Sequence, residues 1–202
     1  MFKKKWYEYL WIWPVIYFSL GFFNIIFAWL ELIDFLVPLY FAIFKGNKNF
    51  CNRYCGRGQF FAVVGKRFGW LKNSYAPIWL TSKWFRYGFL TFFLLMFSNM
   101  LFQTWLVASG AENLEAVVKL FWTVQVPWSW AYTAGSVPDW VAKFSFGLYG
   151  LMLTSMIIGI VVMALYKPRT WCSFCPMGTM TQGICKLKAK QLEPNRKFNE
   201  EK

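Results

Sequence analysis

The hydrophobic residues of this chain are gathered in long runs. The first run extends from Leu10 to Phe44, and two more extend from Tyr87 to Ser109 and from Phe144 to Tyr166. A helix that crosses a bilayer needs about 20 apolar residues, so each of the later runs predicts one spanning helix. We therefore predict an all-α polytopic membrane protein.

The first run is long for one crossing and short for two. Its 35 residues contain only two charged positions, Glu31 and Asp34. A tight turn between these two would give two crossings and about four spanning helices in all, whereas one long helix bent near Gly21 or Pro38 would give three. The basic patch in residues 1–6 favours a cytoplasmic amino terminus, and hence the hairpin.

Shorter segments predict helices that lie at the membrane surface, one after each cysteine pair. The segment from Gln59 to Leu71 places its apolar side chains near one face, as expected of an amphipathic interfacial helix. A second such helix is predicted over Thr179–Lys190. We predict a single membrane domain, residues 1–202, built of two similar halves (about 10–86 and 87–193), with a mobile polar tail at 194–202.

Basic residues are divided unevenly between the loops. Nine Lys or Arg lie in residues 45–86 and eight from Lys167 onward, against two in residues 110–143. The positive-inside rule places both basic segments in the cytoplasm, so we predict a multi-pass protein of the cytoplasmic (inner) membrane. The same rule accounts for the net charge of +13. We therefore predict that the basic loops contact the lipid bilayer and that the protein does not bind nucleic acid.

In the last apolar run, Gly147, Gly150 and Gly159 allow close helix packing.

Two pairs of thiols follow apolar segments within the basic loops. The first pair has C-x3-C spacing and is followed by Gly56, and the second has C-x2-C spacing and is followed by Pro176. Structural disulfides are rare in the cytoplasm, so these thiols predict a metal centre. We predict the same four residues as cofactor-binding residues and metal ligands: Cys51, Cys55, Cys172 and Cys175.

Four thiolates suit either a [4Fe–4S] cluster or a tetrahedral zinc. The Cys-Pro sequence, the bulky neighbours Tyr54, Trp171 and Phe174, and glycines whose N–H groups can face an anionic centre favour the cluster. Zinc is the alternative cofactor. The fifth thiol, Cys185, stays outside the predicted ligand set, and five cysteines are too few for a second cluster. Four basic residues near the pairs are predicted to supply compensating charge: Arg53, Arg57, Lys167 and Arg169.

Several kinds of chemistry are excluded by the residues themselves. The chain has no histidine, which excludes bis-His haem, His-ligated metals and a His general base. The pair Gly56 and Gly58 lacks the rest of a dinucleotide-binding fingerprint. We assign no catalytic residue and predict an electron-carrying subunit rather than a stand-alone enzyme.

The repeated order of apolar helix, cysteine pair and short helix, over Phe35–Leu71 and Phe144–Lys190, resembles the membrane-bound 4Fe-4S proteins of the NapH and NosR type. That family has C-x3-C-P in both places, whereas here each pair keeps only part of the pattern. The resemblance implies a relay of single electrons between redox proteins or subunits of a membrane complex, in an anaerobic respiratory or maturation system. The alternatives are a scaffold protein with a Cys₄ zinc site and a cluster-based redox sensor.

Overall fold

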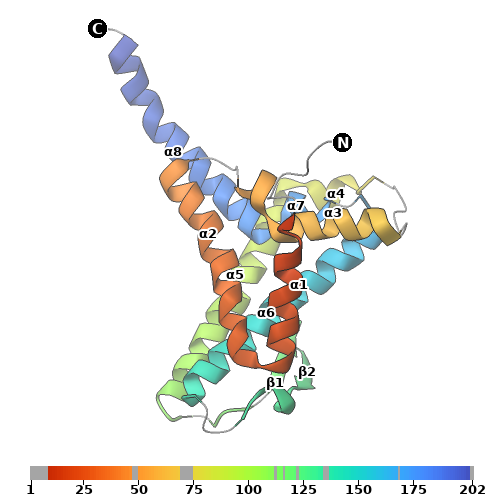
Figure 1. The fold of residues 1–202 in the computed structure, drawn as a ribbon. Helices are drawn as coiled ribbons and strands as arrows, with labels where there is room; N and C mark the ends of the chain where they lie inside the picture. The colour runs from red at the N-terminus through yellow and green to blue at the C-terminus, as the bar shows by residue number, and fades with distance from the viewer. Residues whose placement is uncertain are drawn as a thin grey trace.

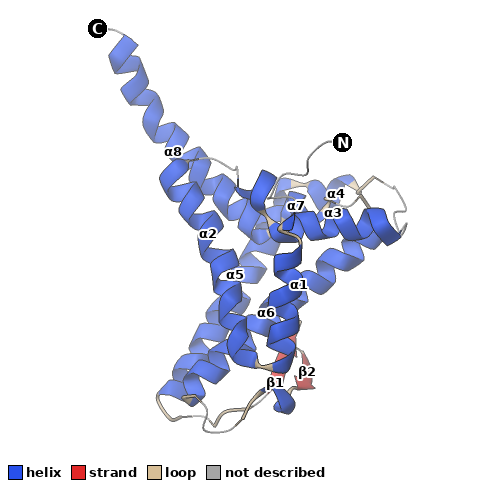
Figure 2. Cartoon of the chain, viewed as in Figure 1, coloured by secondary structure: helices blue, strands red, loops and turns tan. Residues whose placement is uncertain are grey.

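The computed structural model describes residues 9–46, 50–68, 75–111, 113–115, 117–121, 123–133, 137–167 and 169–200. Most of them form helices, arranged as a bundle that is capped at one end by further helices (Figure 1, Figure 2). The elements are, in chain order, α1 (Ile12–Phe23), η2 (Ile25–Trp29), α2 (Leu30–Lys45), η3 (Phe50–Tyr54), α3 (Gly56–Phe68), α4 (Ile78–Thr81), α5 (Lys83–Ala108), β1 (Val117–Leu120), β2 (Val124–Pro127), η4 (Ser129–Ala131), α6 (Asp139–Leu165), α7 (Trp171–Phe174) and α8 (Pro176–Glu200).

Three helical stretches are long and apolar enough to cross a membrane: η2 with α2, α5, and α6. Helix α1 is also apolar, but its 12 residues rise only about 18 Å, against a hydrocarbon core of about 30 Å. The described residues thus contain three helical stretches that could cross a membrane and, beside them, the shorter apolar helix α1. The basic patch in residues 1–6 lies outside the described residues.

Helices α1 and α2 form the predicted hairpin, but the predicted turn at Glu31–Asp34 is wrong. The chain reverses at Asn24, which is extended (φ −145°, ψ 118°) and ends α1. The side-chain oxygen of Asn24 accepts the N–H of Ile26 at 3.1 Å, so this residue also caps the start of η2. The two acidic residues lie inside helix α2 instead.

Helices α5 and α6 run in opposite directions and pack against each other. The glycines of α6 permit the predicted close packing. A Cβ at Gly150 would lie 2.7 Å from the backbone oxygen of Lys119 in β1. Gly147 and Gly159 are covered in the same way by side chains from α5 and α3. Helix α6 is thereby the central element, with more buried residues than α2 or α5, the other two long apolar helices.

The fold is mostly rather than entirely helical, because the loop between α5 and α6 contains a β-hairpin. Strands β1 and β2 pair antiparallel, with Val118 opposite Val126. Val118 is buried in a cluster with Phe146 and Tyr149 of α6. The hairpin therefore packs on the end of the bundle opposite the cap (Figure 1).

The cap consists of α3, α4, α7 and the start of α8. Helix α3 confirms a helix after the first cysteine pair, and its Phe61 is buried against α6; predicted positions 69–71 lie outside the described residues. Helix α8 runs to Glu200, past the predicted end at Lys190. The mobility of residues 194–202 and the likeness of the two halves remain predictions.

Candidate metal centre

The four cysteines of the predicted site line one cavity beneath the cap. Cys51 lies in η3 and Cys55 directly after it, while Cys172 lies in α7 and Cys175 directly after it. Segments that lie far apart in the sequence thus contribute thiols to one cavity. Cys185, which we left outside the ligand set, is not among the residues that line the cavity.

The second thiol of each pair immediately precedes a helix. The carbonyl of Cys55 accepts the N–H of Gln59 at 3.1 Å, and the carbonyl of Cys175 accepts the N–H of Thr179 at 2.9 Å. Pro176 is the first residue of α8, a position that suits proline because no helical partner is needed for an N–H there. The Cys-Pro sequence therefore places a thiol at a helix start.

Backbone N–H groups face the sulfur atoms at these helix starts. The N–H of Gly58 hydrogen-bonds to the Cys55 sulfur, and that of Gly178 to the Cys175 sulfur. A Cβ at Gly58 would lie 3.4 Å from the Cys172 sulfur, so the glycine keeps backbone close to two thiols. N–H groups at a helix start stabilise negative charge, as a thiolate-ligated centre requires.

Burial keeps the thiols of Cys55 and Cys175 protonated when nothing is bound to them. It raises the pKa of Cys55 to about 12 and also raises the pKa of Cys175. The hydrogen bond from Gly58 to the Cys55 sulfur opposes this shift only in part. Binding of a metal centre must therefore displace protons from these residues.

An aromatic wall closes one side of the cavity. Trp171 lines the cavity, and Trp171 and Phe174 are 3% and 1% exposed. Phe85 and Phe89 of α5 pack edge-on against them, with centroid distances of 5.3 Å for Phe85–Phe174 and 5.7 Å for Phe89–Trp171. Tyr54, also predicted to screen the site, lines a neighbouring crevice instead. Water is thus excluded mainly from the side of α5 and α7.

The four thiols do not form a ready-made site for a single ion. In the part of the chain that the structure describes, no three Cys, Asp or Glu side chains lie close enough to hold one metal ion. A tetrahedral zinc, with Zn–S bonds of about 2.3 Å, would need sulfur atoms roughly 3.8 Å apart. A [4Fe–4S] cluster takes four cysteines without this requirement, because each cysteine binds a different iron.

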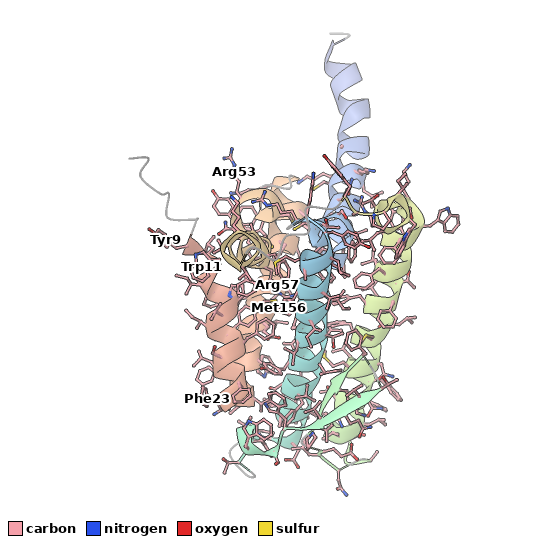
Figure 3. The ribbon with its side chains drawn as sticks, turned by 90° about the vertical axis from the view of Figure 1, so that its right-hand side faces the viewer. Tyr9, Trp11, Phe23, Arg53, Arg57 and Met156 are labelled. Carbon is pink, nitrogen blue, oxygen red and sulfur yellow. The ribbon has the colours of Figure 1, made fainter. Side chains whose placement is uncertain are left out.

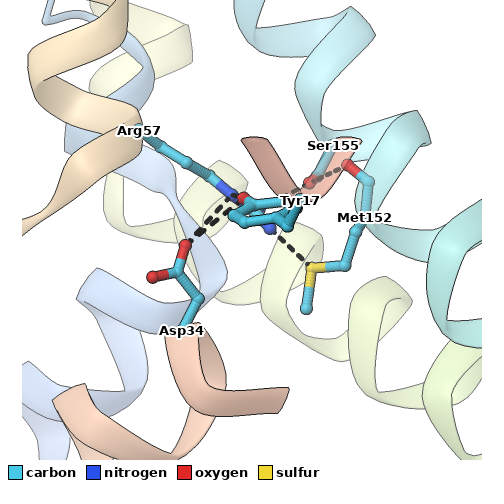
Figure 4. Close-up of polar contacts among 5 residues, drawn as sticks. All are labelled: Tyr17, Asp34, Arg57, Met152 and Ser155. Carbon is cyan, nitrogen blue, oxygen red and sulfur yellow. Dashed lines mark hydrogen bonds and ion pairs between the residues drawn. The ribbon is translucent and has the colours of Figure 1, made fainter. Parts of the chain in front are cut away.

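Arg57 connects the cavity to the interior of the bundle (Figure 4). Its Nε donates to the Tyr17 hydroxyl at 3.0 Å. Its two terminal nitrogens donate to Ser155 Oγ at 3.0 Å and to Met152 Sδ at 2.8 Å. Asp34 accepts from Tyr17 at 3.3 Å, and its Oδ2 lies 3.9 Å from Arg57 Nε. Burial works to lower the pKa of Arg57, but the neighbouring acidic groups outweigh it and raise that pKa, so the guanidinium stays charged.

The other basic residues expected to compensate charge lie farther out. Arg53 is exposed and points away from the bundle (Figure 3). Lys167 stacks over the Tyr75 ring, 3.5 Å from its centroid. Arg169 is exposed but close enough to Cys172 to act on it electrostatically. Arg57 is therefore the compensating charge that the fold places at the cavity itself.

Sequence reasoning missed the partners of Arg57. The sequence pattern predicts a turn at Glu31 and Asp34, and it gives no local signal for Tyr17 or Ser155. An acidic residue in a membrane-spanning run is by itself a sign of function, and that rule would have singled out Asp34 and Glu31. It would not have identified the hydroxyl groups.

Comparison with known proteins yields one family. No curated protein and no solved structure matches the chain. Residues 149–192, from α6 through α7 into α8, match the family model described as 4Fe-4S binding domain. The matched segment contains Cys172 and Cys175 and leaves the first cysteine pair outside. This match supports an iron–sulfur binding protein, as the cysteine pattern predicted.

Proposed function

We propose that this chain is a membrane electron-transfer protein that holds one [4Fe–4S] cluster on Cys51, Cys55, Cys172 and Cys175. The observation that carries the proposal is the shared cavity lined by both cysteine pairs. The family match supports the cofactor through the second pair. When bound, such a cluster supplies a centre that accepts and releases one electron.

The surrounding residues have separate roles in this proposal. The N–H groups of Gly58 and Gly178 stabilise thiolate charge, and the wall formed with Trp171 excludes water, which together influence the potential. Arg57 adds a fixed positive charge on the bilayer side. Cys172 is the one exposed thiol of the four, so electrons would enter or leave near it.

The partners in this proposal are other redox proteins or subunits of a membrane complex. The three apolar helices support a place in a membrane, and the basic loops at the cysteine end favour the cytoplasmic side of the inner membrane. The resemblance to the NapH and NosR type favours an anaerobic respiratory or maturation system. A reporter fused after residue 202 tests the sidedness, because α8 begins at the cysteine end.

Anaerobic purification with iron and sulfide analysis tests the cofactor. We expect about four irons per chain, visible absorbance, and a paramagnetic signal after reduction. Cys51→Ser and Cys172→Ser should each lose iron and absorbance, since each removes a ligand from a different segment. Cys185→Ser is the matched control and should keep both.

A colourless protein with one zinc per chain would reject the proposal in favour of a zinc-stapled scaffold. Loss of iron in the Cys172→Ser variant but not in the Cys51→Ser variant would reject the ligand set instead. In that outcome the second pair would bind iron without the first.

A further inference from the structure

We propose that reduction of the site is coupled to the uptake of one proton by the Asp34 carboxylate. This inference rests on the proposed function, because it needs a one-electron centre in the cysteine cavity. It adds proton binding to electron transfer, and it is carried by the position of Asp34 and by the charges around it.

Asp34 lies between the electron site and a route to water. It lines the cysteine cavity and also an open crevice bounded by α1, α2 and η3. Lys45 and Tyr54, which belong to the cysteine end of the bundle, line the same crevice. The Asp34 side chain is 17% exposed, and the crevice leads from it to Lys45 and Tyr54, which gives a proton a path that does not cross the bundle.

The titratable and charged groups that face Asp34 come from several elements. Tyr17 of α1 donates to it, and Arg57 of α3 forms its ion pair. Glu31 lies one turn earlier on the same helix. Lys45 and Tyr54 line the crevice.

The other helices packed on α2 bring few titratable groups near it. Tyr149 of α6 is close enough to Glu31 to interact with it electrostatically, and Cys55 lines the same cavity as Asp34. Lys188 of α8 contacts only the last carbonyls of α2. The charge nearest to Asp34 is therefore that of Arg57. Both side chains line the cavity, so any negative charge added there interacts electrostatically with both of them.

Glu31 is the second acid of the network and already carries its proton in our interpretation. It is 0% exposed, and neither carboxyl oxygen has a hydrogen-bond partner among the described residues. Arg57, the cation of this network, is paired with Asp34. An ionised, unpaired carboxylate at such depth would be strongly unfavourable. Asp34 is thus the carboxylate that remains free to change its protonation.

The coupled step balances in charge. One electron comes from a one-electron reductant, and the added negative charge in a medium of low dielectric disfavours the neighbouring carboxylate. A proton from water enters through the crevice and forms an O–H bond on Asp34. The ion pair with Arg57 is lost, while Arg57 keeps its hydrogen bonds to Tyr17 and Ser155. Oxidation reverses the step.

Redox titration of the purified, cluster-loaded protein at several pH values tests the inference. For one proton per electron, each tenfold fall in proton concentration lowers the midpoint potential by about 59 mV. Asp34→Asn should remove this slope, and Asp34→Glu should restore it. Glu31→Gln should keep the slope, as should the exposed control Glu115→Gln.

Infrared difference spectra of oxidised and reduced wild-type protein provide a second measurement if Asp34→Asn does not fold. A protonated carboxyl band should appear on reduction. A pH-independent potential in a protein with an intact cluster signal would overturn the inference and leave the proposed function standing, as would a slope that persists in Asp34→Asn. A protein without any cluster signal would instead overturn the proposed function.

Discussion

Replacing Arg57 by methionine should destabilise the protein strongly, even in its metal-free form. The change removes two hydrogen bonds to oxygen acceptors, each of 3.0 Å, and leaves Asp34 without its cation. Hydrogen bonds to a charged group contribute about 1.5–3 kcal/mol each, and breaking a buried ion pair from one side costs about 3–5 kcal/mol. Arg57 and Asp34 are both well buried, with 16% and 17% of their side chains exposed. We therefore expect the free energy of unfolding to fall by about 3–5 kcal/mol.

The assay is denaturant-induced unfolding in detergent micelles, followed by tryptophan fluorescence on metal-free protein. The expected loss corresponds to roughly two to three and a half orders of magnitude in the unfolding equilibrium. Arg53→Met, an exposed change in the same segment, is the control and should stay within about 0.5 kcal/mol. Adding Asp34→Asn to Arg57→Met should recover about 1–3 kcal/mol, because no unpaired carboxylate remains. A loss below about 1 kcal/mol for Arg57→Met, or strict additivity in the cycle, would refute the reasoning.

Three further predictions test the packing, the helix end and the thiols. Gly159→Leu should lower the free energy of unfolding by about 1–3 kcal/mol or more, because an aromatic ring of α3 lies on it, whereas Gly88→Leu, with open space around it, should not. Lys188→Met removes the cation from the carbonyls at the end of α2, so the free energy of unfolding should fall by about 0.3–1 kcal/mol in the same assay. Lys186→Met, at an exposed position, is the control and should leave the free energy of unfolding unchanged. In metal-free protein, alkylation of Cys55 should rise about tenfold per pH unit up to about pH 12, since only the thiolate reacts; a plateau near neutral pH, read by mass spectrometry, would contradict the raised pKa.

Local sequence rules predicted the parts of this protein that depend on neighbouring residues. The apolar runs predicted α5 and α6 to within a few residues at each end. Pro176 and the glycines after the first pair indicated helix starts beside the thiols, where α8 and α3 begin. The same rules failed at Asn24, because a single polar residue in an apolar run carries less weight than two acids one turn apart.

The sequence by itself determined that this chain is mostly helical, carries long apolar helices, and has two cysteine pairs suited to an iron–sulfur centre. The sequence also predicted that both pairs share one site, but only the tertiary structure decided which residues surround that cavity and that Arg57 turns inward to Tyr17 and Asp34. The physical reason is the distance along the chain over which each effect acts. Periodicity, caps and charge bias act over one or two helical turns. The pairing of a buried charge instead depends on which helices pack together, and that follows from shape and burial over the whole bundle.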